Sequence, residues 1–171
     1  MKKAERLVPP GFDVKLELKY CVAALVAASA VLLLGYLILY SDGRNGMYEW
    51  VRGVQREREG AVFPDCKSML MPGLVAFIIA SAAFLALVWR YVSYHFKGGS
   101  RCIYTMRRLH SRGELYVRCG ALPVLGLLAC QIIWRLLSLG CGLAYMHFTP
   151  ERWLAPGAWD AIVRFVMYWG G

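Results

Sequence analysis

The sequence predicts an all-α integral membrane protein with three transmembrane helices and additional interfacial amphipathic helices. Hydrophobic residues make up 58% of the 171-residue chain and charged residues only 18%, which is too apolar for an ordinary soluble domain. Charged residues are absent from 21–40 and from 68–89, and between 119 and 150 Arg135 is the only one. A bilayer crossing needs about 20 apolar residues. Each of these three stretches is therefore long enough to span a membrane.

Seven segments follow from this pattern. In chain order they are an arm (1–20), a first span (21–40), an outer loop (41–67), a second span (68–94), a second loop (95–118), a third span (119–146) and a tail (147–171). We interpret the first span as a retained helix, not a signal peptide, because it is longer than a signal core and lacks an Ala-x-Ala cleavage site.

The distribution of basic residues predicts the orientation. Lys and Arg number eleven in the arm and second loop together, against five in the outer loop. By the positive-inside rule, the N-terminus and the second loop are cytoplasmic, while the outer loop and the tail face outward. Membrane orientation and anionic lipid explain most of the net charge of +9, so we expect no nucleic-acid partner. These features suit a multi-pass protein of a bacterial plasma membrane.

The segments outside the spans carry weaker signals. Residues 12–20 mix charged and apolar side chains, which favours a short interfacial element before the first span. In the outer loop, 41–46 is a turn-forming stretch and 47–59 is predicted to be helical. At the end of the second span, we expect Arg90 to extend toward the cytoplasmic lipid headgroups.

The sequence contains no recognisable catalytic, cofactor or metal site. Its six cysteines have no CxxC or metal-like spacing, and its three histidines are scattered. No phosphate-binding G-x-x-x-x-G-K-[ST] motif and no HExxH motif is present. We therefore expect a protein that is not an enzyme and binds no cofactor of its own.

Gln131 and Arg135 interrupt the third span. If the helix enters the bilayer near Gly120, Arg135 lies about 22 Å deep, past the midplane of a core about 30 Å thick. An intramembrane Arg faces a bundle interior, a cavity or an acidic partner. Alternatively, the helix is shorter and Arg135 reaches the outer interface. A partner for it would be Asp160, an acid of the outer loop, or a residue of another chain.

The second loop has the strongest local signals. Residues 101–109 are predicted to form a short amphipathic helix, and Ser111 and Glu114 have the spacing of a capping box, which predicts a new helix leading into the third span. The residues that carry these signals, which the resemblance described next marks as candidates for binding a partner, are Arg101, Met106, Arg107, Arg108, Leu109, Ser111, Arg112 and Glu114.

At residues 104–115, Tyr-Thr-Met-Arg-Arg-Leu-His-Ser-Arg-Gly-Glu-Leu, the sequence resembles the first half of ABC-2 type permeases, the membrane subunits of a group of ABC transporters. In that family a Leu-Pro-x-Ser-Arg-x-Glu-like turn precedes the third span, and His110 stands here in place of the usual Pro. The resemblance extends over residues 5–146 in the order of segments, although its specific part is this dozen.

The resemblance implies a coupling helix at 101–114 that binds a cytoplasmic ATPase, so that ATP would be bound by a partner subunit. It implies a non-catalytic transporter subunit that works with other membrane subunits or as a homo-oligomer. An alternative for the loop is an amphipathic segment bound to lipid headgroups. An alternative for the protein is a small regulatory or scaffolding membrane protein that assembles with another membrane protein.

Overall fold

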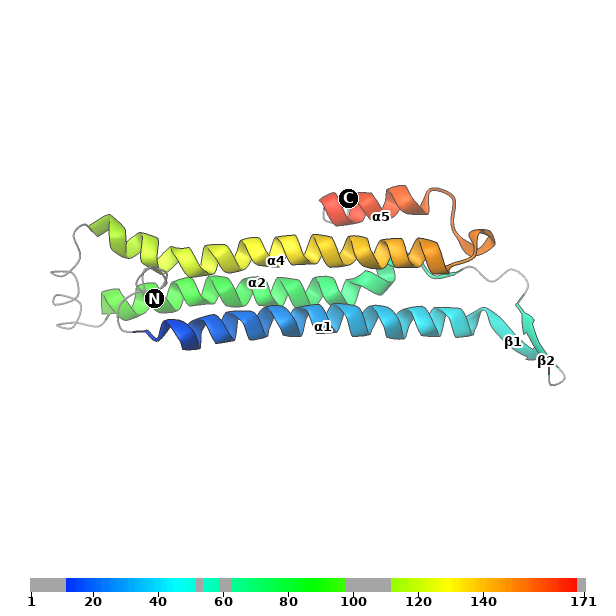
Figure 1. Ribbon diagram of the computed structural model, residues 1–171, viewed down its shortest axis with the longest axis horizontal. Helices are drawn as coiled ribbons and strands as arrows, with labels where there is room; N and C mark the ends of the chain where they lie inside the picture. Colours follow the sequence, from blue (N-terminus) through cyan, green and yellow to red (C-terminus); the bar gives the residue numbers. More distant parts are fainter. Residues whose placement is uncertain (1–11, 52–53, 59–62, 98–111, 169–171) are drawn as a thin grey trace. The chain divides into compact units, whose positions relative to one another are not determined.

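The computed structural model describes residues 12–51, 54–58, 63–97 and 112–168 (Figure 1). Within them the chain is mostly helical, with three long helices, α1 (Val14–Gly46), α2 (Cys66–Lys97) and α4 (Arg112–Phe148), and a shorter one, α5 (Ala158–Tyr168). Stretches of the long helices at Val14–Gly46, Cys66–Tyr94 and Cys119–Phe148 are long and apolar enough to cross a membrane. The predicted class, a helical membrane protein with three spans, is confirmed.

The chain forms two compact units, each containing part of all three long helices. The first comprises residues 1–27 and 78–131, and the second comprises 28–77 and 132–171. Many large apolar side chains of the long helices point outward, including Leu37 and Leu136, which are 60% and 65% exposed. Outward-facing apolar side chains are what a lipid environment requires.

In the first unit, α2 and α4 pack closely through a glycine. A Cβ atom on Gly126 would lie 2.4 Å from Cε1 of Phe84, so only Gly fits beneath that ring. Phe84 is 1% exposed, and Leu122 and Cys130 of α4 are also buried. Small residues at helix contacts let apolar helices approach closely, which provides packing where the hydrophobic effect does not.

In the second unit, glycines allow the same close packing between α1 and α2. A Cβ atom on Gly73 would lie 2.6 Å from Cβ and Cγ of Leu32, and a Cβ on Gly35 would lie 3.3 Å from Cβ of Pro72. On the α4 side of the unit, the ring of Trp134 lies 5.8 Å from that of Phe77. These contacts form the centre of the second unit.

Aromatic side chains close one end of the second unit. The ring of Phe63 contacts those of Tyr40, Tyr145 and Trp153 at centroid distances of 5.4, 5.7 and 6.2 Å. The Tyr145 hydroxyl donates to the carbonyl oxygen of Pro64 at 3.1 Å. This cluster joins the end of α4 to the segment that precedes α2.

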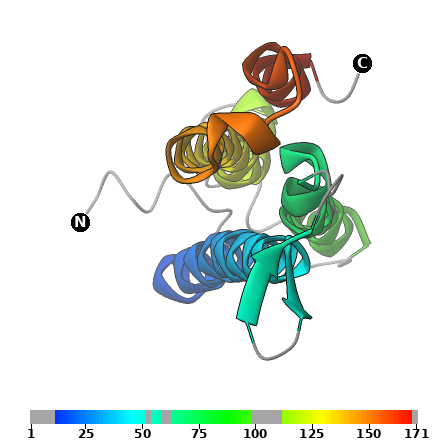
Figure 2. The same ribbon diagram turned by 90° about the vertical axis from the view of Figure 1, so that its right-hand side faces the viewer.

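A β-hairpin replaces the helical segment that the sequence predicts at 47–59, and this prediction was wrong. Strands β1 (Tyr48–Val51) and β2 (Val54–Glu57) pair antiparallel, with Tyr48 opposite Glu57 and Val51 opposite Val54 (Figure 2). The physical reason is that aromatic and β-branched residues favour strands. In addition, two residues ending in Gly separate the strands, a length and composition typical of hairpin turns.

Helix α1 also extends beyond the predicted span at both ends. Its start is set by Asp13, whose side chain accepts a hydrogen bond from the Lys15 backbone N–H at 2.9 Å, the geometry of an N-cap. Residues 14–20 are therefore part of the long helix, not a separate interfacial element. The stretch 41–46 is helical and not a turn, and Gly43 there packs against Pro64, whose Cδ would lie 3.2 Å from an added Cβ.

The tail folds back along α4. After the 3₁₀ helix η2 (Glu151–Trp153), the chain turns at Gly157, which has φ +76°, and enters α5. Ile162 of α5 fits against Gly142, and Phe165 lies 6.4 Å from the ring of Trp134. Because later residues of α5 meet earlier residues of α4, the two helices run antiparallel.

Candidate functional site

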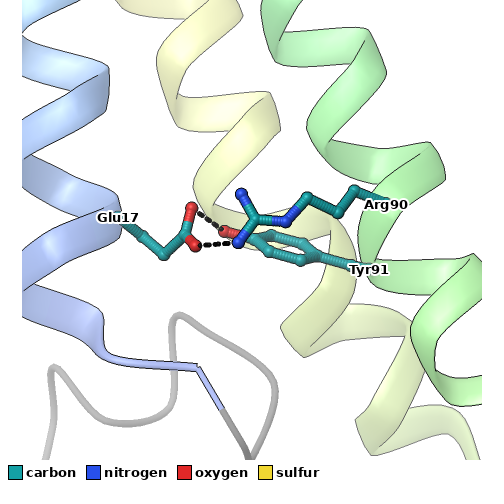
Figure 3. Close-up of polar contacts among 3 residues, drawn as sticks. All are labelled: Glu17, Arg90 and Tyr91. Carbon is teal, nitrogen blue, oxygen red and sulfur yellow. Dashed lines mark hydrogen bonds and ion pairs between the residues drawn. The ribbon is translucent and has the colours of Figure 1, made fainter.

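The described part of the first unit contains a buried carboxylate with two partners from another helix (Figure 3). Glu17 of α1 is 2% exposed. Its carboxylate forms an ion pair with Arg90 and accepts a hydrogen bond from Nη2 of that residue at 2.8 Å. The Tyr91 hydroxyl donates to the other carboxylate oxygen at 3.1 Å. Each oxygen therefore has its own donor, one charged and one neutral.

Aromatic rings surround this pair. The Phe12 ring lies 4.9 Å from the rings of both Tyr91 and Tyr94, in edge-on arrangements. The Arg90 guanidinium carbon lies 5.1 Å from the centre of the Phe12 ring, which is cation–π geometry. We call Phe12, Glu17, Arg90, Tyr91 and Tyr94 the Glu17 cluster.

The local sequence explains how the cluster is positioned. Glu17 lies in the first turn of α1, because Asp13 caps that helix and its carbonyl accepts the Glu17 backbone N–H at 3.0 Å. Arg90 and Tyr91 lie in the last two turns of α2. The start of one helix therefore lies beside the end of the next, as expected for consecutive antiparallel helices.

The cluster links α1 to α2 through an ion pair and a hydrogen bond. Burying a carboxylate is costly unless it is paired and hydrogen-bonded, and both conditions are met here. Arg90 remains 53% exposed at its side chain, so the pair lies at the edge of the packed region. The cluster therefore holds the α1 start against the α2 end.

Sequence reasoning did not find the partner of Arg90. Its guanidinium binds Glu17, which the sequence analysis placed in a separate arm, and its extension toward the lipid headgroups stays a prediction. A signal for this pair was present in the sequence. Glu17 is an acidic residue near the start of the first helix, and Arg90 is a basic residue near the end of the second. When consecutive helices run antiparallel, the start of the first lies beside the end of the second.

The candidate partner-binding residues of the second loop lie mainly outside the described residues. These are Arg101, Met106, Arg107, Arg108, Leu109 and Ser111. Arg112 and Glu114 lie at the start of the described part of α4, and the capping box predicted with Ser111 stays a prediction. The predicted roles of the loop residues in binding a partner stay predictions.

The two polar residues of the third span have different surroundings. Gln131 is half-buried, whereas Arg135 is exposed on α4. Within the described part of its own unit, Arg135 has no ion-pair partner. On the buried side of α4, Trp134 Nε1 and Ser138 Oγ have no hydrogen-bond partner among the described residues.

A small cavity of about 130 Å³ lies in the second unit between α5 and the start of α2. Its lining is mainly apolar, with Leu70, Ile162 and Phe165, and its charged lining residues are Asp65 and Lys67. The Lys67 ammonium lies 5.5 Å from the centre of the Phe165 ring, so this cation already has an aromatic contact. Among the described residues, no group of His, Cys, Asp and Glu has the arrangement of a metal site.

No family model, curated protein or solved structure matches this chain.

Proposed function

We propose that the protein is a non-catalytic transmembrane subunit of an ABC-type transporter that couples a separate cytoplasmic ATPase to substrate export in a bacterial plasma membrane. The observation that carries the proposal is that the second loop connects two of the long helices. Helix α2 is described as far as Lys97, and α4 from Arg112. The sequence resemblance to permeases at 104–115 covers the end of this connection and the first residues of α4.

The Glu17 cluster supports a coupling role for this end of the first unit. A displacement of the loop would act on α2 and α4, and α2 is joined to α1 through Glu17 and Arg90. ATP binding to the partner would bias the protein between two helix arrangements by differential binding to them. Three spans do not enclose a transport pathway, so the working unit needs a homo-oligomer or other membrane subunits.

The proposal is tested by reversing loop charges. The variant Arg107→Glu, Arg108→Glu, Arg112→Glu is expected to lower recovery of the ATPase with the tagged protein, and stimulation of ATP hydrolysis, by at least about tenfold. The matched control, Arg44→Glu, Arg56→Glu, Arg58→Glu, makes the same charge change in the outer loop and should leave both quantities unchanged.

Purification in mild detergent with mass spectrometry must first recover an ABC ATPase in stoichiometric amount. Its absence rejects the transporter proposal.

A second candidate function, a regulatory or scaffolding membrane protein, is favoured by one observation, the exposed Arg135 on an otherwise apolar helix. In this case Arg135→Gln would abolish assembly although the second loop is intact, and no ATPase would be recovered with the wild type. The two candidates therefore predict different purified complexes and different sensitive residues.

A further inference from the structure

Arg135 lies deep within the third span. It is 16 residues after Cys119 and 13 before Phe148, the ends of the span. At about 1.5 Å per residue, these separations are about 24 Å and about 20 Å along the helix. A hydrocarbon core about 30 Å thick, centred on this span, therefore contains Arg135 near its middle.

A contact with α2 supports this depth independently. Trp134, the neighbour of Arg135, has its ring 5.8 Å from that of Phe77. Phe77 belongs to the charge-free stretch 68–89 and lies well inside both of its ends. On this side, the α4 residues at this level therefore lie beside the apolar part of α2.

The side of α4 that carries Arg135 is unpartnered within its unit and otherwise apolar. Ile132, Leu136 and Leu143 are 58%, 65% and 58% exposed. Gly140 is exposed at the far edge of this face, next to Leu136 and Leu143, with nothing within 4 Å of an added Cβ atom. Small residues of this kind allow another helix to approach closely. We call Ile132, Arg135, Leu136, Gly140 and Leu143 the Arg135 face.

A charged residue at this depth requires an anion. Charges within transmembrane segments pair with one another or line a cavity, because hydrocarbon solvates them poorly. The spans of a second copy of this chain do not supply the anion, whichever way it is inserted. The charge-free stretches 21–40 and 68–89 and the third span contain no Asp or Glu, and Glu17 is already bound to Arg90.

We infer that the Arg135 face binds a transmembrane helix of a different protein that carries an Asp or Glu near its middle. The guanidinium would pair with that carboxylate, while Gly140 and the flanking apolar side chains would pack against the helix. This inference goes beyond the proposed function, because it holds whether the partner is a permease chain or another membrane protein.

A defined probe tests the inference without knowledge of the natural partner. The probe is a poly-leucine transmembrane peptide with one central Asp, compared with the same peptide carrying a central Asn, in phosphatidylcholine vesicles. Energy transfer between labelled peptide and purified protein should show about 3- to 20-fold tighter association of the Asp peptide. This preference should vanish in Arg135→Gln and largely persist in Arg135→Lys.

Two controls make this result specific. Arg164→Gln removes one exposed positive charge from α5 and should keep the full preference for the Asp peptide. If the wild type binds the Asp and Asn peptides equally, the inference is wrong. It is also wrong if adding phosphatidylglycerol abolishes the preference, since Arg135 would then reach lipid headgroups.

The natural partner is tested by photo-crosslinking from position 136 in native membranes. The crosslinked helix should contain an Asp or Glu, and replacing that acid with Asn or Gln should reduce recovery of the complex as much as Arg135→Gln does. Crosslinks only to lipid or to a second copy would overturn the inference. A crosslinked membrane partner that is still recovered in full with Arg135→Gln would overturn the inference too, whereas recovery of the ATPase through the second loop would leave the transporter proposal intact. An Arg135-dependent membrane partner without an ATPase would support the inference and reject the transporter proposal.

Discussion

The Glu17 carboxylate and the Arg90 guanidinium, 73 residues apart in sequence, form an ion pair of 2.8 Å that joins the first turn of α1 to the end of α2. The hydroxyl of Tyr91, the residue next to Arg90, donates a hydrogen bond to the second carboxylate oxygen. Two adjacent residues of one helix thus hold one buried acid of another, which restricts both the sliding and the rotation of α1 against α2.

We expect Arg90→Ala to destabilise the protein by about 1–3 kcal/mol, because the Glu17 carboxylate stays buried with only one donor. Thermal unfolding of the detergent-solubilised protein measures the loss. The matched control is Arg44→Ala, which removes an exposed Arg near the other end of α1 and should change stability by less than about 0.5 kcal/mol. Equal losses in the two variants would show that the ion pair does not stabilise the helix contact.

Tyr91→Phe should have a smaller effect than Arg90→Ala. It removes one hydrogen bond from a neutral donor to the Glu17 carboxylate but retains the ring that contacts Phe12, so the expected cost is about 1–2 kcal/mol. The same unfolding assay ranks the two variants. A larger loss for Tyr91→Phe than for Arg90→Ala would mean that the hydroxyl, and not the guanidinium, is the main partner of the acid.

Gly73→Ala should loosen the packing of α1 on α2 in the second unit. The added methyl group would lie 2.6 Å from Cβ and Cγ of Leu32, atoms close to the backbone of α1, so the helix itself must move. Overpacking of this kind costs about 1–3 kcal/mol. Gly140→Ala is the control, since nothing lies within 4 Å of its added methyl group and Ala favours the helix by up to about 1 kcal/mol. Opposite signs are expected for the two variants in thermal unfolding.

The β-hairpin should depend more on its aromatic contact than on its ion pair. Arg152 pairs with Glu57 where both side chains are largely exposed, so a double-mutant cycle with Ala should give a coupling of about 0.2–1 kcal/mol. Trp153 contacts Tyr48 of the hairpin and stacks on the buried Phe63. Trp153→Ala should therefore increase amide hydrogen exchange in Tyr48–Glu57 more than Arg152→Ala does.

Membrane orientation is tested with introduced cysteines. In a cysteine-free variant, Val54→Cys should react with a membrane-impermeant maleimide in intact cells, because Val54 is 61% exposed on the hairpin in the predicted outer loop. Lys97→Cys, in the predicted cytoplasmic loop, should react only after the membrane is opened. The reverse pattern would invert the orientation and place the second loop out of reach of a cytoplasmic ATPase.

Sequence by itself determined the class and the three spans, because the requirement of a hydrocarbon layer is local and compositional. An apolar, charge-free stretch of sufficient length satisfies it whatever the neighbouring helices are. A helix that continues from the end of the second loop into the third span was also predictable from local signals.

Tertiary structure alone decided the hairpin, the full length of α1 and the partner of Glu17. Residues 47–59 are a short mixture of apolar and polar residues that suits a helix or a strand, and the strands make their contacts with Arg152 and Trp153, about a hundred residues later. Likewise, the end of α1 packs on Pro64, and Glu17 meets Arg90 only when two helices have a particular rotation and register. These features depend on geometry between distant segments, which local composition does not encode.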